Sequence, residues 1–168
     1  TALSPAAQQL FAARRRRLMD AYGPGTAIAI PGARLQSRNS DVEFEFRQNS
    51  DLYYLTGFVE PEAFLVLVPG RTEGEVILFL RPRDRERETW DGRRVGLERA
   101  REFLGVDVAH NISELDKVLS DLFSHVQQIA APFGQDAALD HLLHKSARKH
   151  RQQPRLHLDG PDASAELA

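Results

Sequence analysis

The strongest structural signal in the chain is AFLVLVPGRTEGEVILFL, residues 63–80. Two apolar runs, 63–68 and 75–80, are rich in residues that favour strands, and the polar segment between them contains the Pro-Gly pair of a turn. Both runs are continuously apolar rather than alternating, which indicates strands that are covered on both faces. We therefore expect a hairpin of two central strands in a sheet between helices, with four buried residues: Leu65, Leu67, Val76 and Leu78.

The segments on either side predict further helices and strands. A helix is expected from Ser4-Pro5 to about Tyr22, and its four adjacent arginines, residues 14–17, are expected to be solvated. A short helix is expected from Asn49 or Ser50 through Tyr54, ending at Gly57, and further helices are expected at 97–104, from Ser113 and at 136–149. The expected strands lie at 26–30, 106–109, 126–131 and 155–158, and a long connection is expected at 31–45. This order predicts an α/β domain of three layers, a mixed central β-sheet flanked by helices.

Composition narrows the class of protein. The 168 residues suffice for one domain, and 42% hydrophobic with 27% charged residues is typical of a soluble globular protein. The net charge of −2 gives no general attraction to nucleic acid or to anionic membranes. The absence of cysteine excludes disulfides and thiolate metal sites, and no apolar run approaches the roughly 20 residues of a membrane helix. We expect a cytoplasmic protein that binds neither nucleic acid nor membrane.

Patterns that carry catalysis are hard to find. His141 and His144 have helical spacing with Asp140 beside them, and such a pair could hold zinc, but no HExxH pattern accompanies them and the next turn is basic. Exposed helix histidines are the interpretation we favour. No nucleophile elbow, P-loop or G-x-G-x-x-G occurs. The sequence therefore predicts no catalytic residue and no metal ligand.

Two stretches resemble a known family: FRQNSDLYYLTGFVEPEAFLVLV at 46–68 and ETWDGRRVG at 88–96. They are similar to the N-terminal domain of aminopeptidase P, the Xaa-Pro aminopeptidases related to prolidase and creatinase. The resemblance implies a mixed-sheet domain with a ribonuclease-H-like trace over residues 1–159, followed here by a polar tail, 160–168. In the family, a C-terminal pita-bread domain holds two manganese ions and hydrolyses peptides with proline in second position. That domain is absent from this chain, so the resemblance implies that this fragment alone is inactive.

The same resemblance implies which residues gate the substrate. The family forms homo-oligomers in which N-terminal domains help to wall neighbouring active sites. Trp90 matches a tryptophan that faces an adjacent subunit's pocket, Asp41 matches an acid at the intersubunit contact, and Arg93 or Arg94 is expected to support the loop. The alternatives are that Trp90 is a packing residue and Asp41 a turn former.

The polar segment before the two tyrosines is interpreted as a structural corner, because Asn, Ser and Asp side chains bond to nearby backbone. In this interpretation Tyr53, Tyr54 and Phe58 pack beneath the sheet. The corner residues are Arg47, Asn49, Asp51, Tyr54 and Gly57.

The resemblance therefore implies a non-catalytic assembly and substrate-gating domain of a manganese-dependent Xaa-Pro aminopeptidase. Its expected partners are the pita-bread domain, the neighbours in a homo-oligomer and proline-containing peptides. The alternative is a free-standing interaction module that kept the fold.

Overall fold

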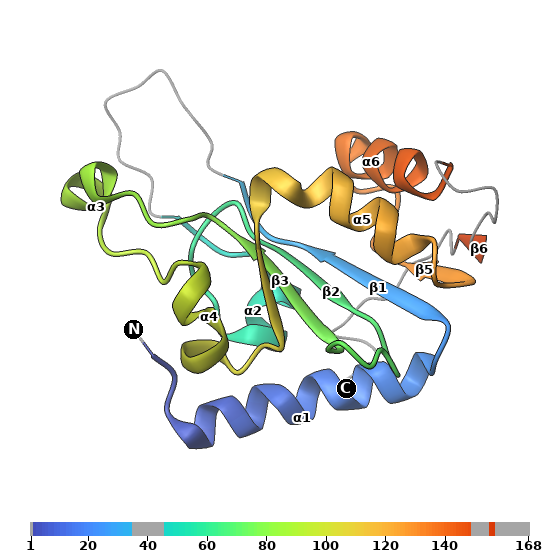
Figure 1. Cartoon of the computed structure of the whole chain (residues 1–168), viewed down its shortest axis with the longest axis horizontal. Coiled ribbons are helices and arrows are strands. Elements are labelled where there is room, and N and C mark those ends of the chain that lie inside the picture. The colour runs from blue at the N-terminus through green and yellow to red at the C-terminus, as the bar shows by residue number, and fades with distance from the viewer. Residues whose placement is uncertain (1, 35–45, 149–154, 157–168) are drawn as a thin grey trace.

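The computed structural model describes residues 2–34, 46–148 and 155–156 (Figure 1). Within them the helices are α1 (Pro5–Tyr22), α2 (Ser50–Thr56), α3 (Arg85–Asp91), α4 (Leu97–Leu104), α5 (Leu115–Phe123) and α6 (Ala137–Arg148), and a 3-10 turn covers Ile112–Glu114. The strands are β1 (Thr26–Pro31), β2 (Phe64–Leu67), β3 (Val76–Leu80), β4 (Val108–Asn111), β5 (Gln128–Ala130) and β6 (Arg155–Leu156).

The strands form one mixed sheet in the order β4-β3-β2-β1-β5-β6. β2 is antiparallel to both of its neighbours, whereas β1 with β5, β3 with β4 and β5 with β6 are parallel pairs. The predicted hairpin is confirmed, because Leu65 lies opposite Leu78 and Leu67 opposite Val76, and all four side chains are buried.

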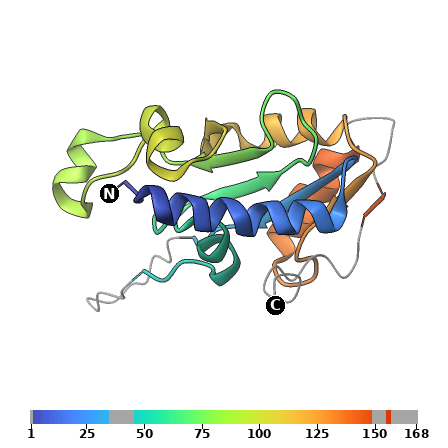
Figure 2. The ribbon, with the colours of Figure 1, turned by 90° about the horizontal axis from the view of Figure 1, so that it is seen from below.

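Helices cover both faces of the sheet, which explains the continuous apolar runs. On one face, α1, α2 and α4 contribute Leu18, Leu52 and Leu104 to a core with the strands; on the other, α5 and α6 contribute Phe123 and Leu143. Figure 1 shows these two layers on opposite sides of the strands, and Figure 2, seen from below, shows α1 running across the near side. The expected three-layer α/β class is confirmed.

Two features differ from expectation, and a third prediction is not tested. The fourth strand begins at Val108 rather than at 106, because the Asp107 carboxylate turns toward β3 and accepts hydrogen bonds from the amides of Glu75 and Val76, both at 3.0 Å. The helix α3 was not expected. The last strand is described only at 155–156, so the boundary expected at 159/160 and the polar tail lie outside the described residues.

The described residues include no helix with the length and apolar character needed to cross a membrane.

Candidate functional site

Gln48 joins the segment that follows β1 to the segment that follows α2. Its side-chain oxygen accepts from the amides of Ala33 (2.9 Å) and Asn49 (3.0 Å), and its side-chain nitrogen donates to the carbonyl of Glu60 (2.8 Å). One side-chain amide therefore satisfies three backbone groups, two of them more than ten residues away in the chain. Sequence reasoning did not single out Gln48, because the glutamine gives no sign of which backbone groups the fold will bring to it.

Asn49 caps the N-terminus of α2. Its side-chain oxygen accepts from the amides of Asp51 (3.0 Å) and Leu52 (3.1 Å), which would otherwise be unpaired in the first turn. The carboxylate of Asp51 lies in that first turn, where a negative charge suits the helix dipole. Arg47 is exposed. The corner therefore rests on Gln48 and Asn49.

The other end of α2 is held by arginines of α1. Arg14 donates to the carbonyl of Tyr54 (3.1 Å) with its guanidinium 4.0 Å from the tyrosine ring centre, and Arg15 donates to the carbonyl of Leu55 (2.9 Å). These carbonyls belong to the last turn of a helix and lack intrahelical partners. Arg15 is only 2% exposed, so the expectation that the arginine run is solvated was wrong for this residue. Burial lowers the pKa of Arg15.

The aromatic residues of the corner separate into two environments. Phe58 is buried and Tyr54 is partly buried against the core, as expected. Tyr53 is 51% exposed, and its ring meets Phe11 edge-on, so the expectation that it packs beneath the sheet was wrong. The reason is the phase of α2, which turns Leu52 and Leu55 to the core and Tyr53 outward.

Trp90 lies on α3, and its side chain is 88% exposed. Asp84 caps this helix by accepting from the amides of Glu86 and Arg87, both at 3.2 Å. None of its residues is buried, and Figures 1 and 2 show it at the opposite end of the molecule from β6. Within the described residues, Trp90 therefore belongs to neither hydrophobic core.

Glu88 connects the two segments that flank α3. Its carboxylate oxygens accept from Arg83 Nε (3.1 Å) and Nη2 (3.0 Å), and one of them also accepts from the amide of Arg94 (2.9 Å). The Glu88 side chain is only 8% exposed. Its hydrogen bonds with Arg83, followed by the bond from the Arg94 amide, lower the pKa of Glu88 to about 2.

Arg94 fastens the chain where it returns from α3. Its residue is 7% exposed, and Nη1 donates to the carbonyl of Pro82 (3.1 Å). Arg99 of α4 donates to the carbonyls of Arg94 (2.8 Å) and Val95 (3.0 Å). Arg93 is exposed and makes no side-chain hydrogen bond or ion pair to the residues that the structure describes. The expected loop support therefore comes from Arg94.

A partly buried charged cluster of Glu60, Arg81 and Arg94 lies next to this segment. Glu60 Oε2 accepts from the amide of Val95 (2.8 Å), and Oε1 lies 3.9 Å from Arg81 Nη2. Three buried polar atoms of this cluster have no hydrogen-bond partner among the described residues: Glu60 Oε1, Arg81 Nε and Arg94 Nε. Burial, and then the neighbouring charge of Arg94, lower the pKa of Arg81. The segment from 83 to 94, which contains α3 and Trp90, is thus held by polar contacts rather than by apolar packing.

Asp41, the second expected gating residue, lies outside the described residues.

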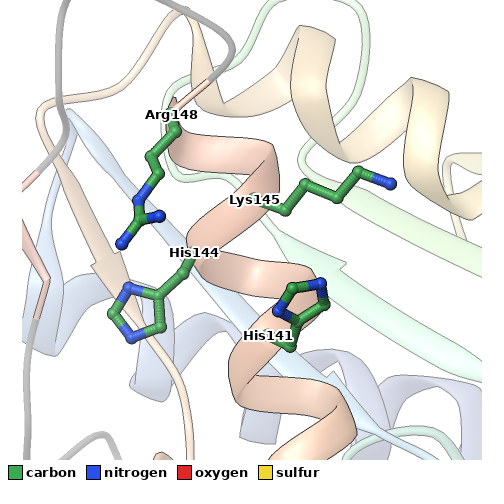
Figure 3. Close-up of a pocket in the computed structure, with 4 residues that line it drawn as sticks. All are labelled: His141, His144, Lys145 and Arg148. Atoms are coloured by element: carbon green, nitrogen blue, oxygen red, sulfur yellow. The ribbon is translucent and has the colours of Figure 1, made fainter.

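The histidine pair does not converge on a metal position. Figure 3 shows the four side chains that line a cavity of about 470 Å³ along α6, with His144 and Arg148 directed to the left of the helix in this view and His141 and Lys145 to the right. The neighbouring Asp140 carboxylate accepts from the amide of Gly134 (3.0 and 3.1 Å), and His144 contacts the ring of Phe133. Nowhere in residues 2–34 and 46–148 do three or more His, Cys, Asp or Glu side chains gather as a metal site.

A larger cavity, about 1070 Å³, lies at the carboxyl ends of β1, β4 and β5, where α/β proteins commonly bind ligands. Its lining mixes apolar side chains with charges of both signs, among them Arg34, Arg47, Glu62 and Asp136. These side chains provide no paired nucleophile and base.

The described residues thus form an α/β domain that presents the exposed Trp90 on α3. A family model described as "Aminopeptidase P, N-terminal domain" matches residues 11–130, and the chain belongs to this family.

Known proteins of this kind are similar along most of the chain. It is 38% identical over 160 residues to Xaa-Pro aminopeptidase of Escherichia coli, and this match covers 95% of the chain and 36% of the E. coli protein. It is 42% identical over 125 residues to Xaa-Pro aminopeptidase of Haemophilus influenzae, and this match covers 71% of the chain and 29% of that protein. The solved structure of E. coli aminopeptidase P in its low-pH form matches with a TM-score of 0.83 and 36% identity, over 95% of this chain and 37% of that one. The structure of Pseudomonas aeruginosa aminopeptidase PepP matches with a TM-score of 0.82 and 38% identity, over 89% of this chain and 35% of that one. The chain therefore spans between 29% and 37% of the length of these relatives. A further E. coli structure is of a zinc-substituted form in complex with product.

Proposed function

We propose that this chain is the non-catalytic assembly and substrate-gating domain of a manganese-dependent Xaa-Pro aminopeptidase. Its relatives carry the name of that activity, and the chain covers only about a third of their length. Hydrolysis at two manganese ions then belongs to the C-terminal pita-bread domain. We place the enzyme in the cytoplasm, in keeping with a chain that has no cysteine.

The single observation that carries the gating role is the exposure of Trp90. An indole offers a large flat apolar surface, and burying it in water-free contact with a ligand is favourable. Trp90 nevertheless points away from its own chain, on a helix that is braced from behind by Glu88 and Arg94. We infer that its ring contacts a proline-containing peptide at the active site of a neighbouring subunit. Asp41 is proposed as a second contact there.

Replacement of Trp90 in the intact enzyme tests this function. Aromatic side chains at the centre of a contact cost about 2 kcal/mol or more when truncated, which corresponds to roughly a 30-fold loss of affinity. Trp90→Ala should therefore lower kcat/KM for Xaa-Pro peptides by at least about tenfold, with Trp90→Phe less affected. The matched control is Val59→Ala, which truncates another exposed apolar side chain.

Stability of the 168-residue chain distinguishes gating from packing. Because Trp90 is exposed, Trp90→Ala should change the free energy of unfolding by less than about 0.5 kcal/mol. A variant that unfolds the chain while the intact enzyme keeps its kinetics would show that Trp90 has a structural role instead.

A free-standing interaction module is the second candidate, because an exposed tryptophan on a braced loop also suits a protein partner. The source gene decides between the two. Codons for a metal-binding pita-bread domain downstream of this chain support the peptidase, and a stop codon at that place supports the module.

A further inference from the structure

α3 has little of the packing that normally fixes a helix. It contains seven residues, none of which belongs to the hydrophobic core, and isolated helices of this length are not stable in water. Its direction must therefore be set by specific polar contacts. The Asp84 cap orders the first turn, but it belongs to the same segment and does not connect the helix to the rest of the molecule.

Glu88 is the residue of α3 that makes this connection. Its carboxylate accepts from Arg83, which precedes the helix, and from the amide of Arg94, which follows it. Arg94 is in turn held by the Pro82 carbonyl and by Arg99 of α4. The entire excursion from 83 to 94 is thus closed around one carboxylate.

The helix geometry relates Glu88 to Trp90. Successive residues of an α-helix are rotated by about 100°, so positions 88 and 90 are about 200° apart and face nearly opposite directions. The exposures agree with this, since the Glu88 side chain is 8% exposed and Trp90 88%. Fixing Glu88 against the body of the domain therefore fixes Trp90 toward the outside.

We propose that Glu88 is the positioning residue of Trp90, and that its contacts with Arg83 and the Arg94 amide hold the indole in the direction in which it meets its ligand. The positioning itself is a property of this chain; its effect on peptide binding rests on the function proposed above. The hydrogen bonds from Arg83 lower the pKa of Glu88 to about 2, so the carboxylate is charged at neutral pH.

The first test measures the motion of Trp90 directly. The chain has one tryptophan, so time-resolved fluorescence anisotropy reports on α3 alone. Glu88→Gln keeps the size of the side chain but removes the charge that pairs with Arg83. The amplitude of the fast local component of the anisotropy decay should therefore increase. Exchange of the Gly92 amide, which donates to the Glu88 carbonyl, should accelerate by about tenfold.

Glu86→Gln is the matched control. Glu86 lies in the same turn and is exposed, and it makes no side-chain hydrogen bond or ion pair within the described part of the chain. This variant loses the same charge near the helix N-terminus but none of the contacts, so anisotropy and exchange should change by less than about twofold. Arg83→Gln, which removes the partner, should reproduce the effect of Glu88→Gln. Equal behaviour of the Glu88 and Glu86 variants would overturn the proposal.

The kinetic test separates this proposal from the proposed function. In the intact enzyme, Glu88→Gln should raise KM for Xaa-Pro peptides by about threefold or more, and should add little when Trp90 is already alanine. If Trp90→Ala leaves KM unchanged, the gating function is wrong, while the anisotropy result still decides the positioning. If Glu88→Gln raises KM equally in the Trp90→Ala background, Glu88 does not act through Trp90.

Discussion

Substitution of Gly57 by alanine should destabilise the domain through two separable effects. Gly57 ends α2 in the left-handed conformation, with φ 68° and ψ 10°, and donates to the Tyr53 carbonyl. A Cβ added there would lie 2.6 Å from Cε2 and 2.8 Å from Cζ of the buried Phe11. The backbone conformation costs an alanine about 1–2 kcal/mol, and forcing extra volume into a packed site costs about 1–3 kcal/mol.

The matched control is Gly105→Ala. Gly105 ends α4 with nearly the same conformation, φ 70° and ψ 23°, but the nearest atom to its added Cβ is the end of the flexible Gln8 side chain at 3.0 Å. We therefore expect a loss of about 2–5 kcal/mol for Gly57→Ala and of about 1–2 kcal/mol for Gly105→Ala.

Urea unfolding of the two variants measures both free energies. Phe11→Leu supplies the decisive third measurement, because leucine lacks the ring atoms that the new Cβ would meet. In that background the additional cost of Gly57→Ala should fall toward that of Gly105→Ala. Equal costs at the two glycines in the wild-type background would refute the argument that α1 packs against the corner through Phe11.

Three other outcomes are expected. Leu67→Ala removes a fully buried side chain of β2 and should cost about 2–5 kcal/mol in denaturant unfolding; a change below about 0.5 kcal/mol would show a peripheral strand. Folding lowers the pKa of Glu88 from 4.5 to about 2, so its carboxylate should stabilise the fold fully above about pH 5 and lose this effect as the pH falls through about 2. The difference in free energy of unfolding between the wild type and Glu88→Gln should therefore disappear at that low pH. The 168-residue chain with manganese should release no amino acid from a Xaa-Pro peptide, and chelator-sensitive turnover that survives repurification would contradict this.

The sheet and most helices could be predicted because their signals are local. Continuous apolar runs identified the hairpin, and capping residues identified the ends of α1 and α2. The sequence did not predict α3, because this helix has no apolar face and therefore shows no helical periodicity of hydrophobic residues. Its order comes from Asp84 and from contacts between Glu88 and residues five positions before and six after it, a pattern that no helix or strand template contains.

The burial of Arg15 illustrates a different limit. Four adjacent arginines cover every side of a helix, so one of them must face the core if the helix packs at all. Phe11 and Leu18 are buried at four residues before and three after Arg15, which places Arg15 on the same stripe. That spacing was visible in the sequence. The sequence could not indicate that the carbonyls of Leu55 and Gly105 accept hydrogen bonds from Arg15, because these carbonyls come from elements distant in the chain.

Mixed oligomers test most directly the proposal that Trp90 serves the active site of a neighbouring subunit. Trp90→Ala subunits with a functional catalytic domain are co-assembled with subunits that retain Trp90 but carry an inactivated catalytic domain. If the indole reaches a neighbouring subunit, kcat/KM for Xaa-Pro peptides in the mixture should exceed the sum of the two separate variants by several-fold. Activity that equals that sum, in oligomers shown to be mixed, would contradict the account.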